Sequence, residues 1–264
     1  MTQPILVTGG TGTLGSRLVP RLREAGQEIR VLTRQHRADE PGVRYVTGDL
    51  STGEGAAAAV EGVGTILHLA GSNKGDDVKT AHLVRAANAA GTHPHLVYIS
   101  VVGAERIPVT STLDRAMFGY FASKRASERV IEQSGLPWTN LRATQFHDLL
   151  LTVVRPLAKL PIALIPAGSF QPIETDEVAA RLVELALGTP AGLVPEMGGP
   201  QILAAKDIMR TYLRALGKNK PVVAMPQPGG AARAVKSGAN LTPNHAVGKK
   251  TWTQFLADRV GTGG

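Results

Sequence analysis

The chain has 264 residues, of which 43% are hydrophobic, so it is long enough for a large α/β domain with a substantial core. It contains no cysteine, which excludes disulfides, thiolate metal sites and cysteine nucleophiles and is consistent with a reducing cytoplasm. No stretch approaches the roughly 20 apolar residues of a membrane-spanning helix, so we expect a cytoplasmic protein without a membrane span.

The first predicted element is a buried strand that runs into a glycine turn. Residues 5–7 are apolar, and glycines follow at positions 9, 12 and 15. In this spacing Gly9 permits a tight turn, Gly12 lets the backbone approach a pyrophosphate, and Gly15 lets a helix pack closely on the strand. We expect the cofactor contacts of this turn to come from Gly9, Thr11, Gly12, Thr13, Leu14 and Gly15.

A helix and a second strand complete this unit. Apolar residues recur on one helical face from Leu14 to Ala25, Pro20 interrupts the interior, and Gly26 is a C-terminal stop signal. Residues 28–33 then have a strand pattern. A strand, a glycine turn, a helix and a strand form a βαβ unit, which predicts a dinucleotide site with the phosphates at the start of the helix.

The residues after the second strand indicate which dinucleotide is bound. An NAD site usually has Asp or Glu there to hold the ribose 2′-hydroxyl, whereas this chain has Arg34 and Arg37. A guanidinium can pair with a 2′-phosphate through two hydrogen bonds, so Arg34 favours NADP(H), with Arg37 as a second partner. The alternative is that both arginines only cover a solvated loop.

Strand and helix patterns continue to alternate along the chain. We expect strands at 43–50, 64–71, 95–100 and 138–143, and helices at 54–60, 76–90 and 118–133. This alternation predicts an α/β fold with a doubly wound parallel sheet, whose ligands lie outside the carboxyl ends of the strands.

The pattern loosens beyond residue 145. Helices are expected at 149–160, 175–187 and 205–216, and residues 226–248 form a candidate mobile lid. We predict a single domain, with a core over about 1–145 and a smaller C-terminal substrate lobe over about 146–264.

The net charge of +8 is regional. No acidic residue lies between Asp207 and Asp258, and the eight cations there equal the whole excess: Arg210, Arg214, Lys218, Lys220, Arg233, Lys236, Lys249 and Lys250. Such a region could attract an anionic substrate, the phosphates of the cofactor or nucleic acid, or could simply be a solvated surface. The aromatic content of 4% and the lack of a DNA-reading helix pattern argue against nucleic acid.

Three polar residues suggest a proton-transfer site. Tyr120 and Lys124 are four positions apart on a predicted helix and therefore share a face, and Ser100 ends the preceding strand. The ammonium of Lys124 would favour the phenolate of Tyr120, and Ser100 could hydrogen-bond a substrate oxygen. Alternatively, Tyr120 packs in the core and Lys124 serves only the cofactor, or one of residues 110–112 replaces Ser100.

Several motifs together resemble those of short-chain dehydrogenases/reductases. They are residues 8–15, Gly48-Asp49-Leu50, Leu69-Ala70-Gly71, Ser100 and Tyr120-x-x-x-Lys124. Residues 33–34, 98–103 and 135–142 are similar to the atypical, NmrA-like branch of this NAD(P)-binding family, and residues 173–179 and 251–252 extend the likeness. The resemblance implies a Rossmann-type fold in which Asp49 and Leu50 flank the adenine, Ala70 and Gly71 lie at the ribose region, and Lys124 binds the nicotinamide ribose.

We therefore expect an NADPH-dependent oxidoreductase that gives hydride to a small carbonyl, quinone or related acceptor. Tyr120 would be the acid, Lys124 would tune it, and Ser100 would orient the oxygen. His147 is a further candidate for the substrate pocket, although a lone histidine often has a supporting role. Because NmrA-like relatives include proteins that only sense the nucleotide, a regulatory NADP(H) sensor with a protein partner is the alternative. The sequence leaves the oligomeric state open.

Overall fold

The computed structural model describes residues 3–71 and 75–260, and the chain divides into two compact units. The first unit comprises Met1–Ser100, Gly119–Arg142 and Asp176–Pro195. The second comprises Val101–Phe118, Ala143–Thr175 and Glu196–Gly264. The chain therefore passes between the units several times, and the helix that carries Tyr120 and Lys124 continues from the second unit into the first.

The first unit contains a seven-stranded sheet with the strand order β3-β2-β1-β4-β5-β6-β9. Its elements are β1 (Ile5–Thr8), α1 (Gly15–Glu24), β2 (Ile29–Thr33), β3 (Val43–Thr47), α2 (Ala56–Val60), β4 (Thr65–His68), α3 (Asp76–Ala89), β5 (His95–Val101), most of α4 (Thr112–Glu132), β6 (Trp138–Ala143), α6 (Thr175–Leu187) and β9 (Gly192–Leu193).

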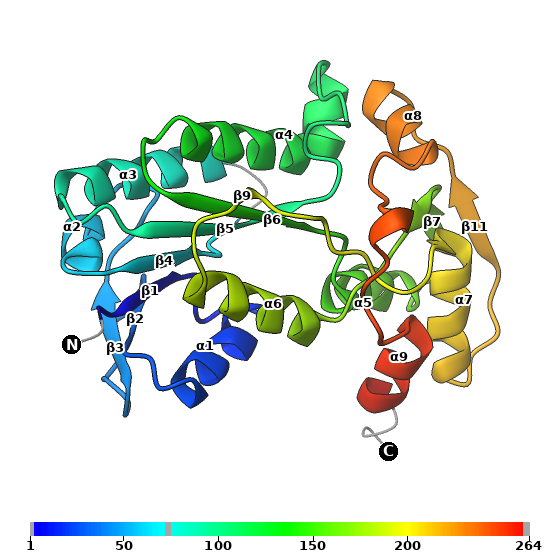
Figure 1. Ribbon diagram of the computed structural model, residues 1–264. Helices are drawn as coiled ribbons and strands as arrows, with labels where there is room; N and C mark the ends of the chain where they lie inside the picture. The colour runs from blue at the N-terminus through cyan, green and yellow to red at the C-terminus, as the bar shows by residue number, and fades with distance from the viewer. Residues whose placement is uncertain (1–2, 72–74, 261–264) are drawn as a thin grey trace. The chain divides into compact units, whose positions relative to one another are not determined.

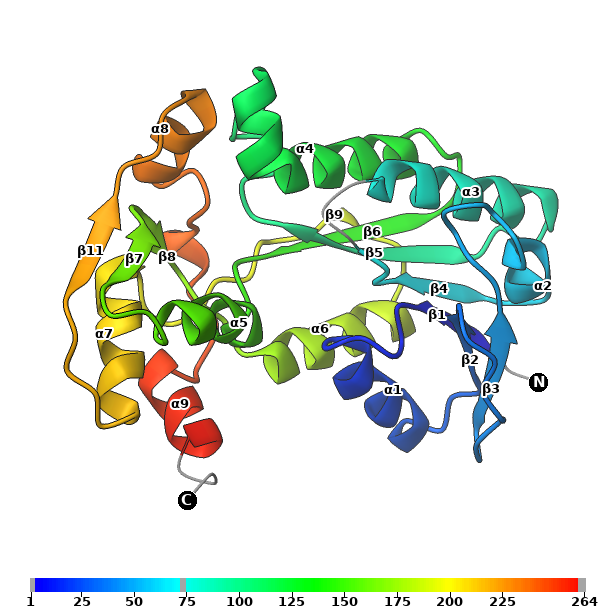
Figure 2. The same cartoon turned by 180° about the vertical axis from the view of Figure 1, so that it is seen from behind.

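Helices cover both faces of this sheet. Strand β1 pairs in parallel with β2 and with β4, and the pairs β2–β3, β4–β5 and β6–β9 are also parallel. Helices α1 and α6 lie on one face, and α2, α3 and α4 lie on the other (Figures 1 and 2). The prediction of a doubly wound parallel sheet is therefore confirmed, and its order reverses between β1 and β4, where such sheets bind ligands.

One hydrophobic cluster of the first unit lies between the sheet and the helices α2, α3 and α4. Leu6, Ile66 and Leu96 from neighbouring strands pack with Leu83 of α3 and Ile131 of α4, and none of these side chains is more than 1% exposed. Burial of this apolar surface fixes α3 and α4 against the sheet, and both helices carry residues of the candidate site.

The second unit has its own core and two small sheets. Its elements are the first turns of α4, α5 (His147–Leu157), β7 (Ala163–Pro166), β8 (Ser169–Phe170), β10 (Leu203–Ala204), α7 (Ala205–Ala215), β11 (Val222–Met225), α8 (Gly230–Lys236), a 3₁₀ turn (Pro243–His245) and α9 (Trp252–Val260). Strand β7 pairs in parallel with β11, and β8 pairs antiparallel with β10. Side chains of α5, α7 and α9 form the core around Met209, Trp252 and Phe255.

Helix α4 begins six residues earlier than expected. Ser111 caps it: the backbone N–H of Asp114 donates to Ser111 Oγ at 3.0 Å, and the backbone N–H of Ser111 donates to the Asp114 carboxylate at 3.2 Å. Such a reciprocal cap satisfies the first N–H groups of a helix, and Asp in the place of the usual Glu or Gln concealed it in the sequence. Ser111 is thus a capping residue.

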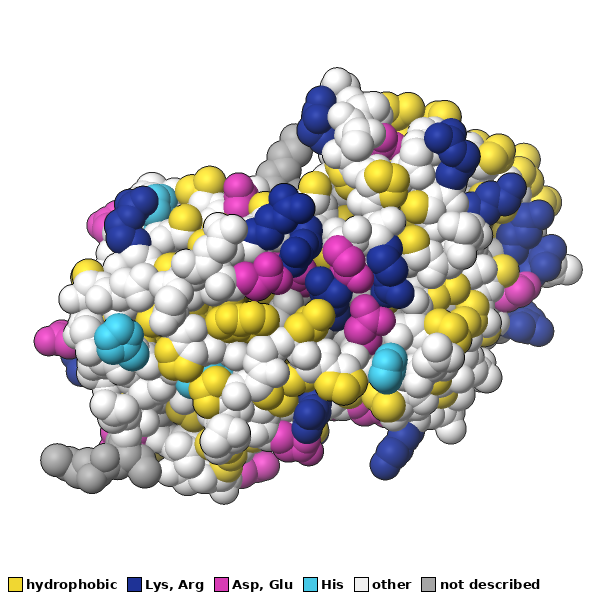
Figure 3. Space-filling view, turned by 45° about the horizontal axis from the view of Figure 1, so that its top comes forward, with side chains coloured by type: hydrophobic (Ala, Val, Ile, Leu, Met, Phe, Trp, Pro, Cys, Tyr) yellow, Lys and Arg dark blue, Asp and Glu magenta, His cyan; other side chains and the backbone are white. Residues whose placement is uncertain are grey.

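The regional charge falls within the second unit. Of the eight cations, Lys220 and Lys250 are half-buried and the other six are exposed. Figure 3 shows Lys and Arg side chains beside hydrophobic ones at the right-hand edge, where α7 and β11 lie in Figure 1. Within residues 3–71 and 75–260, no helix has the length and apolar character that a bilayer crossing requires.

Candidate functional site

The turn after β1 has room only for glycine at two positions. Gly9 has a φ of +73°, and a Cβ there would lie 2.8 Å from the backbone nitrogen of Ala70. A Cβ on Gly15 would overlap the carbonyl oxygen of Gly9, and one on Gly12 would lie 3.3 Å from the same oxygen. The glycines therefore let strand β1, helix α1 and the end of β4 approach one another closely.

Helix α1 follows this turn without a side-chain cap. Leu14 is its N-cap residue, and the alkyl side chain of leucine accepts no hydrogen bond. The turn is instead closed by backbone bonds, including Gly12 N–H to the Gly9 carbonyl at 3.0 Å. An uncapped helix start favours an anion, because its first N–H groups and its dipole both point toward it.

A cavity of about 730 Å³ lies at the carboxyl ends of strands β1 to β4. Its lining residues are Thr8, Gly9, Thr11, Gly12, Leu32, Thr33, Arg34, Gln35, Arg37, Gly48, Asp49, Leu50, Ser51, Leu69, Ala70, Gly71 and Lys79. All of them belong to the first unit, so the cavity is complete within it. Its position matches the ligand site of doubly wound sheets.

Two arginines after β2 line this cavity. Arg34 is exposed, and the guanidinium carbon of Arg37 lies 5.9 Å from the centre of the Tyr45 ring. Stacking on an aromatic ring restricts a guanidinium, whereas Arg34 has no such contact among the residues that the structure describes. Arg34 is therefore the better placed of the two to adjust to a ligand phosphate.

Asp49 adds a carboxylate to the lining of the cavity. It accepts a hydrogen bond from the backbone N–H of Ser51 at 2.7 Å, and this bond is the main reason why the pKa of Asp49 is lowered. The charges of Arg34 and Lys79 lower that pKa further. Asp49 is thus a fixed hydrogen-bond acceptor between two cations.

Tyr120 and Lys124 share one face of α4, as their spacing predicts. The ammonium of Lys124 lies 5.8 Å from the centre of the Tyr120 ring and 4.9 Å from that of Tyr98. A Cβ on Gly71, which lines the cavity, would lie 3.0 Å from the Lys124 ammonium. Lys124 therefore lies directly beside the cavity, although its side chain is only 5% exposed.

The phenol of Tyr120 is held in its neutral form. Burial raises its pKa, and the charge of Lys124 lowers it by less, so the pKa lies above the ordinary value of 10.0. Tyr98 and Asp76 raise it further. Lys124 therefore favours the phenolate, as expected, while burial favours the neutral phenol by more.

Ser100 is two positions after Tyr98 on β5, so both side chains lie on the same side of the strand, and Ser100 is deeply buried. It is 4% exposed, and its Oγ makes no hydrogen bond within the described part of the chain. Burial raises the pKa of the Glu128 carboxyl, but Arg142 and, to a smaller extent, Ser100 lower it, so that it lies below the ordinary value. Arg142 holds Glu128 with two hydrogen bonds of 2.7 and 2.8 Å.

The cavity contains most of the cofactor residues that the motifs predict, and several that they do not. Gly9, Thr11, Gly12, Arg34, Asp49, Leu50, Ala70 and Gly71 line it, whereas Thr13, Leu14 and Gly15 form the turn behind it, and Lys124 lies beside it. Lys79 on α3 is the most informative addition. Lys79 lies about one turn after the start of α3, the helix that follows β4. This position, close to the carboxyl end of a strand in a doubly wound sheet, is the signal in the sequence that could have suggested Lys79.

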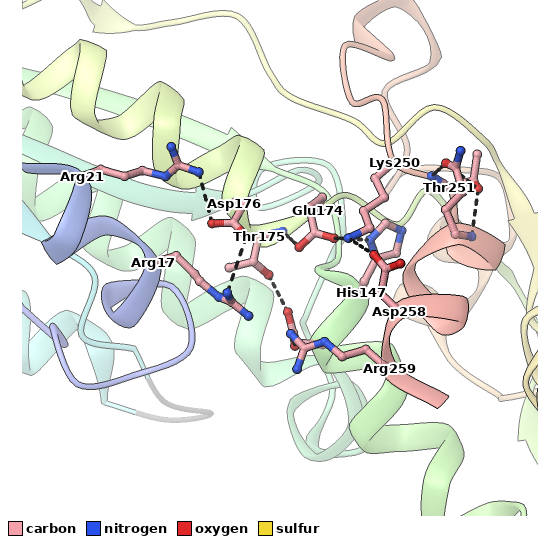
Figure 4. A network of polar contacts seen from close by, with 12 residues as sticks. Arg17, Arg21, His147, Glu174, Thr175, Asp176, Lys250, Thr251, Asp258 and Arg259 are labelled. Atoms are coloured by element: carbon pink, nitrogen blue, oxygen red, sulfur yellow. Dashed lines mark hydrogen bonds and ion pairs between the residues drawn. The ribbon is translucent and has the colours of Figure 1, made fainter. Parts of the chain in front are cut away.

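His147 belongs to a separate cluster in the second unit. Its ring is fully buried and stacks on Phe255 with centroids 4.9 Å apart, while Nδ1 lies 3.8 Å from the Glu174 carboxylate. Figure 4 shows the Lys250 ammonium between Glu174 and Asp258, at 3.3 and 2.7 Å. These contacts anchor α9 to α5.

Comparisons with known proteins agree with this geometry. A family model described as NAD(P)H-binding matches residues 9–186. The (4-alkanoyl-5-oxo-2,5-dihydrofuran-3-yl)methyl phosphate reductase of Streptomyces griseus is 28% identical over 220 residues, which are 81% of this chain and 74% of that relative. The NAD(P)H azoreductase of Xenophilus azovorans is 26% identical over 229 residues, which are 84% of this chain and 77% of that relative.

A solved structure shows the same fold over nearly the whole chain. The structure of the NADPH-dependent quinone oxidoreductase of Escherichia coli in complex with NADPH matches with a TM-score of 0.77. The match covers 97% of this chain and 99% of the Escherichia coli chain. The sequences are 17% identical, so this likeness concerns the fold alone.

Proposed function

The chain belongs to the NAD(P)H-binding family, and we propose that this oxidoreductase transfers hydride from NADPH to a small carbonyl, quinone or related acceptor. The observation that carries the proposal is the position of Lys124, which lies beside Gly71 of the cavity and 5.8 Å from the centre of the Tyr120 ring. Relatives named as reductases of azo compounds and of an oxo-dihydrofuran phosphate support a reduction.

The residues present fit the cofactor. Gly9 and Gly15 leave no space for a Cβ between β1, α1 and the end of β4, and this close packing forms the turn at which dinucleotide-binding folds hold a pyrophosphate. The exposed guanidinium of Arg34 would bind a 2′-phosphate, which NADH lacks. Asp49 would accept a hydrogen bond at the adenine end, and Lys124 would bind the nicotinamide ribose.

The bound cofactor supplies the hydride, and the protein supplies the proton. Tyr120 would donate its phenolic proton to the oxygen of a carbonyl acceptor as the hydride arrives at carbon, so that a C–H and an O–H bond form and the C=O double bond becomes single. The raised pKa keeps this proton on Tyr120 at neutral pH. Lys124 would stabilise the phenolate that remains, and Ser100 would orient the acceptor oxygen.

The proposal is tested by NADPH oxidation with a panel of small ketones, aldehydes and quinones, using the wild type, Tyr120→Phe and the control Phe121→Leu. Phe121 contacts Tyr120 edge to face at 5.8 Å between ring centroids but carries no proton to donate. We expect Tyr120→Phe to lower kcat for carbonyl acceptors by about 100-fold or more with an unchanged Kd for NADPH, and Phe121→Leu to lower it by less than about 5-fold.

Two results would contradict the proposal. If the protein binds NADPH but oxidises it with no acceptor in the panel, hydride transfer is wrong and nucleotide sensing is favoured. If carbonyls are reduced equally fast by Tyr120→Phe, the assignment of the proton donor is wrong.

A further inference from the structure

A buried carboxylate lies between the cavity and the candidate proton donor. Asp76 is 1% exposed at the start of α3, with Oδ2 3.4 Å from the Lys124 ammonium and Oδ1 3.6 Å from that of Lys79. An isolated buried charge is strongly unfavourable, and the two ammonium groups compensate the charge of this carboxylate. Lys79 lines the cavity, and Lys124 lies over the ring of Tyr120.

The position of Asp76 in the first turn of α3 does not by itself explain why this carboxylate is buried. Acidic residues are common in the first turn of a helix, where they interact with its dipole, and Asp77 fills that role equally well. Asp77 is less buried, and no ion pair to Lys124 is formed by it within the described residues. The backbone of Asp76 is also held at both ends: its N–H donates to Ser123 Oγ at 3.2 Å, and its carbonyl accepts from Thr80 Oγ1 at 2.7 Å.

A chain of hydrogen bonds leads from the floor of the cavity to this point. The Ala70 N–H donates to Thr8 Oγ1 at 3.3 Å, and Thr8 Oγ1 and Thr80 Oγ1 contact the two ring nitrogens of His68 at 2.7 and 3.0 Å. Burial lowers the pKa of His68 to about 3, so the ring is neutral and carries a single proton.

The donor and acceptor of each hydrogen bond in this series follow from the last bond, between Thr80 and Asp76. Because Thr80 donates its hydroxyl proton to the Asp76 carbonyl, it must accept from Nε2–H of His68. Nδ1 of His68 is then an acceptor, and Thr8 donates to it. Every donor therefore has an acceptor, and the start of α3 is fixed relative to the ends of β1 and β4.

We infer that Asp76 is the positioning residue of the site, and that its carboxylate fixes the ammonium of Lys124 against Tyr120 and that of Lys79 at the cavity. The inference that Asp76 contributes to catalysis rests on the proposed function, in which Lys124 and Tyr120 are the proton-transfer pair. Asp76 itself acts through Lys124 and not on the substrate.

The inference predicts a change at Tyr120 that needs no turnover to observe. Tyr120 is faced by Lys124 on its own helix, Tyr98 on β5 and Asp76 on α3. Asp76→Asn removes the negative charge that opposes Lys124, so the phenol should lose its proton at lower pH. Absorbance of the phenolate near 295 nm, titrated in the wild type, Asp76→Asn and Asp77→Asn, with Tyr120→Phe to identify the signal of Tyr120, measures this directly.

We expect the midpoint of Tyr120 to fall by about one pH unit or more in Asp76→Asn and by less than about 0.3 unit in Asp77→Asn. In the enzyme assay, the alkaline limb of the kcat profile should move by the same amount. An unchanged midpoint in Asp76→Asn, or equal shifts in both variants, would overturn the inference. The titration gives its answer even if no acceptor is reduced, so a failure of the proposed function is recognised separately.

A second variant covers the case in which Asp76→Asn does not fold. Lys79 is 18% exposed in its side chain, so Lys79→Met disturbs the core less. It removes one of the two ammonium groups that contact Asp76 and should move the Tyr120 midpoint upward. A downward shift in Lys79→Met would contradict the proposed sharing of the carboxylate.

Discussion

Each unit of the molecule contains a fully buried histidine, and the two are held in opposite ways. His68 in the first unit is neutral and hydrogen-bonded through both ring nitrogens to Thr8 and Thr80. His147 in the second unit has no hydrogen bond through either nitrogen within the described residues, and it lies against Phe255 and near the charged Glu174. Hydrogen bonds are directional and ion pairs are less so, which suits the first network to positioning atoms and the second to joining helices.

The largest expected effect on stability comes from removing the neutral His68, which Thr8 and Thr80 contact through hydrogen bonds. His68→Leu leaves the buried hydroxyls of Thr8 and Thr80 without their partner, at about 1 to 3 kcal/mol each. We expect the free energy of unfolding to fall by about 4 kcal/mol and the affinity for NADPH to fall with it, because Ala70 is no longer fixed. Urea denaturation at pH 7 and a binding titration measure the two.

His36→Leu is the matched control, since His36 is exposed and should change stability by less than about 0.5 kcal/mol. A loss in His68→Leu as small as that in the control would show that the hydrogen-bonded chain contributes nothing to stability.

The charged network should be distinguished by its response to acid. The contact with His147 lowers the pKa of Glu174 most, burial opposes it, and Lys250 lowers it again, to a net value of about 2 against an ordinary 4.5. A carboxyl with a lowered pKa stabilises the fold at pH values above 4.5, and this contribution is lost as the pH falls toward 2. We expect Glu174→Gln to lose about 3 kcal/mol at pH 7 and to approach the wild type near pH 2.

Urea denaturation across this pH range tests the prediction, with Asp207→Asn as the control. Asp207 belongs to an exposed pair with Arg210, so its loss should cost less than about 0.5 kcal/mol at any pH. A deficit in Glu174→Gln that does not depend on pH would mean that packing, and not charge, holds this cluster.

The smallest effect is expected at the cavity wall, outside both networks. Arg34→Ala should weaken NADPH binding by about 30-fold, which corresponds to about 2 kcal/mol for the loss of a charge-assisted contact, with little change for NADH and none in stability. Arg37→Ala should have a weaker effect, because Arg37 lies over Tyr45. Equal losses for NADPH and NADH would show that Arg34 does not select the 2′-phosphate.

Local patterns predicted six of the seven strands in the sheet of the first unit, all except β9. Strands such as β1 and β5 are buried apolar runs, and helix α1 ends at a signal such as Gly26, so the alternating order could be derived from the sequence. The short strands of the second unit, such as β8 and β10, are two residues long and have no pattern of their own. They form only because distant segments meet.

The candidate site was predictable where it depends on spacing along the chain. The glycine turn and the pair Tyr120 and Lys124 each lie within a few residues, so their geometry follows from a turn or a helix. Asp76 could not be assigned in this way, because its contact with Lys124 joins α3 to α4 across 48 positions. The raised pKa of Tyr120 likewise depends on burial, which is a property of the assembled fold.

The cavity has a consequence for how long the protein survives. Its walls come from segments between Thr8 and Lys79 that meet only after β1 has paired with both β2 and β4. An unfolded chain therefore has no cofactor site, and a ligand that binds only the native state stabilises it by mass action, by about 2.7 kcal/mol at a hundredfold excess over Kd. The nucleotide that serves the reaction would in this way also protect the chain from unfolding, and a cell depleted of it would lose the protein faster.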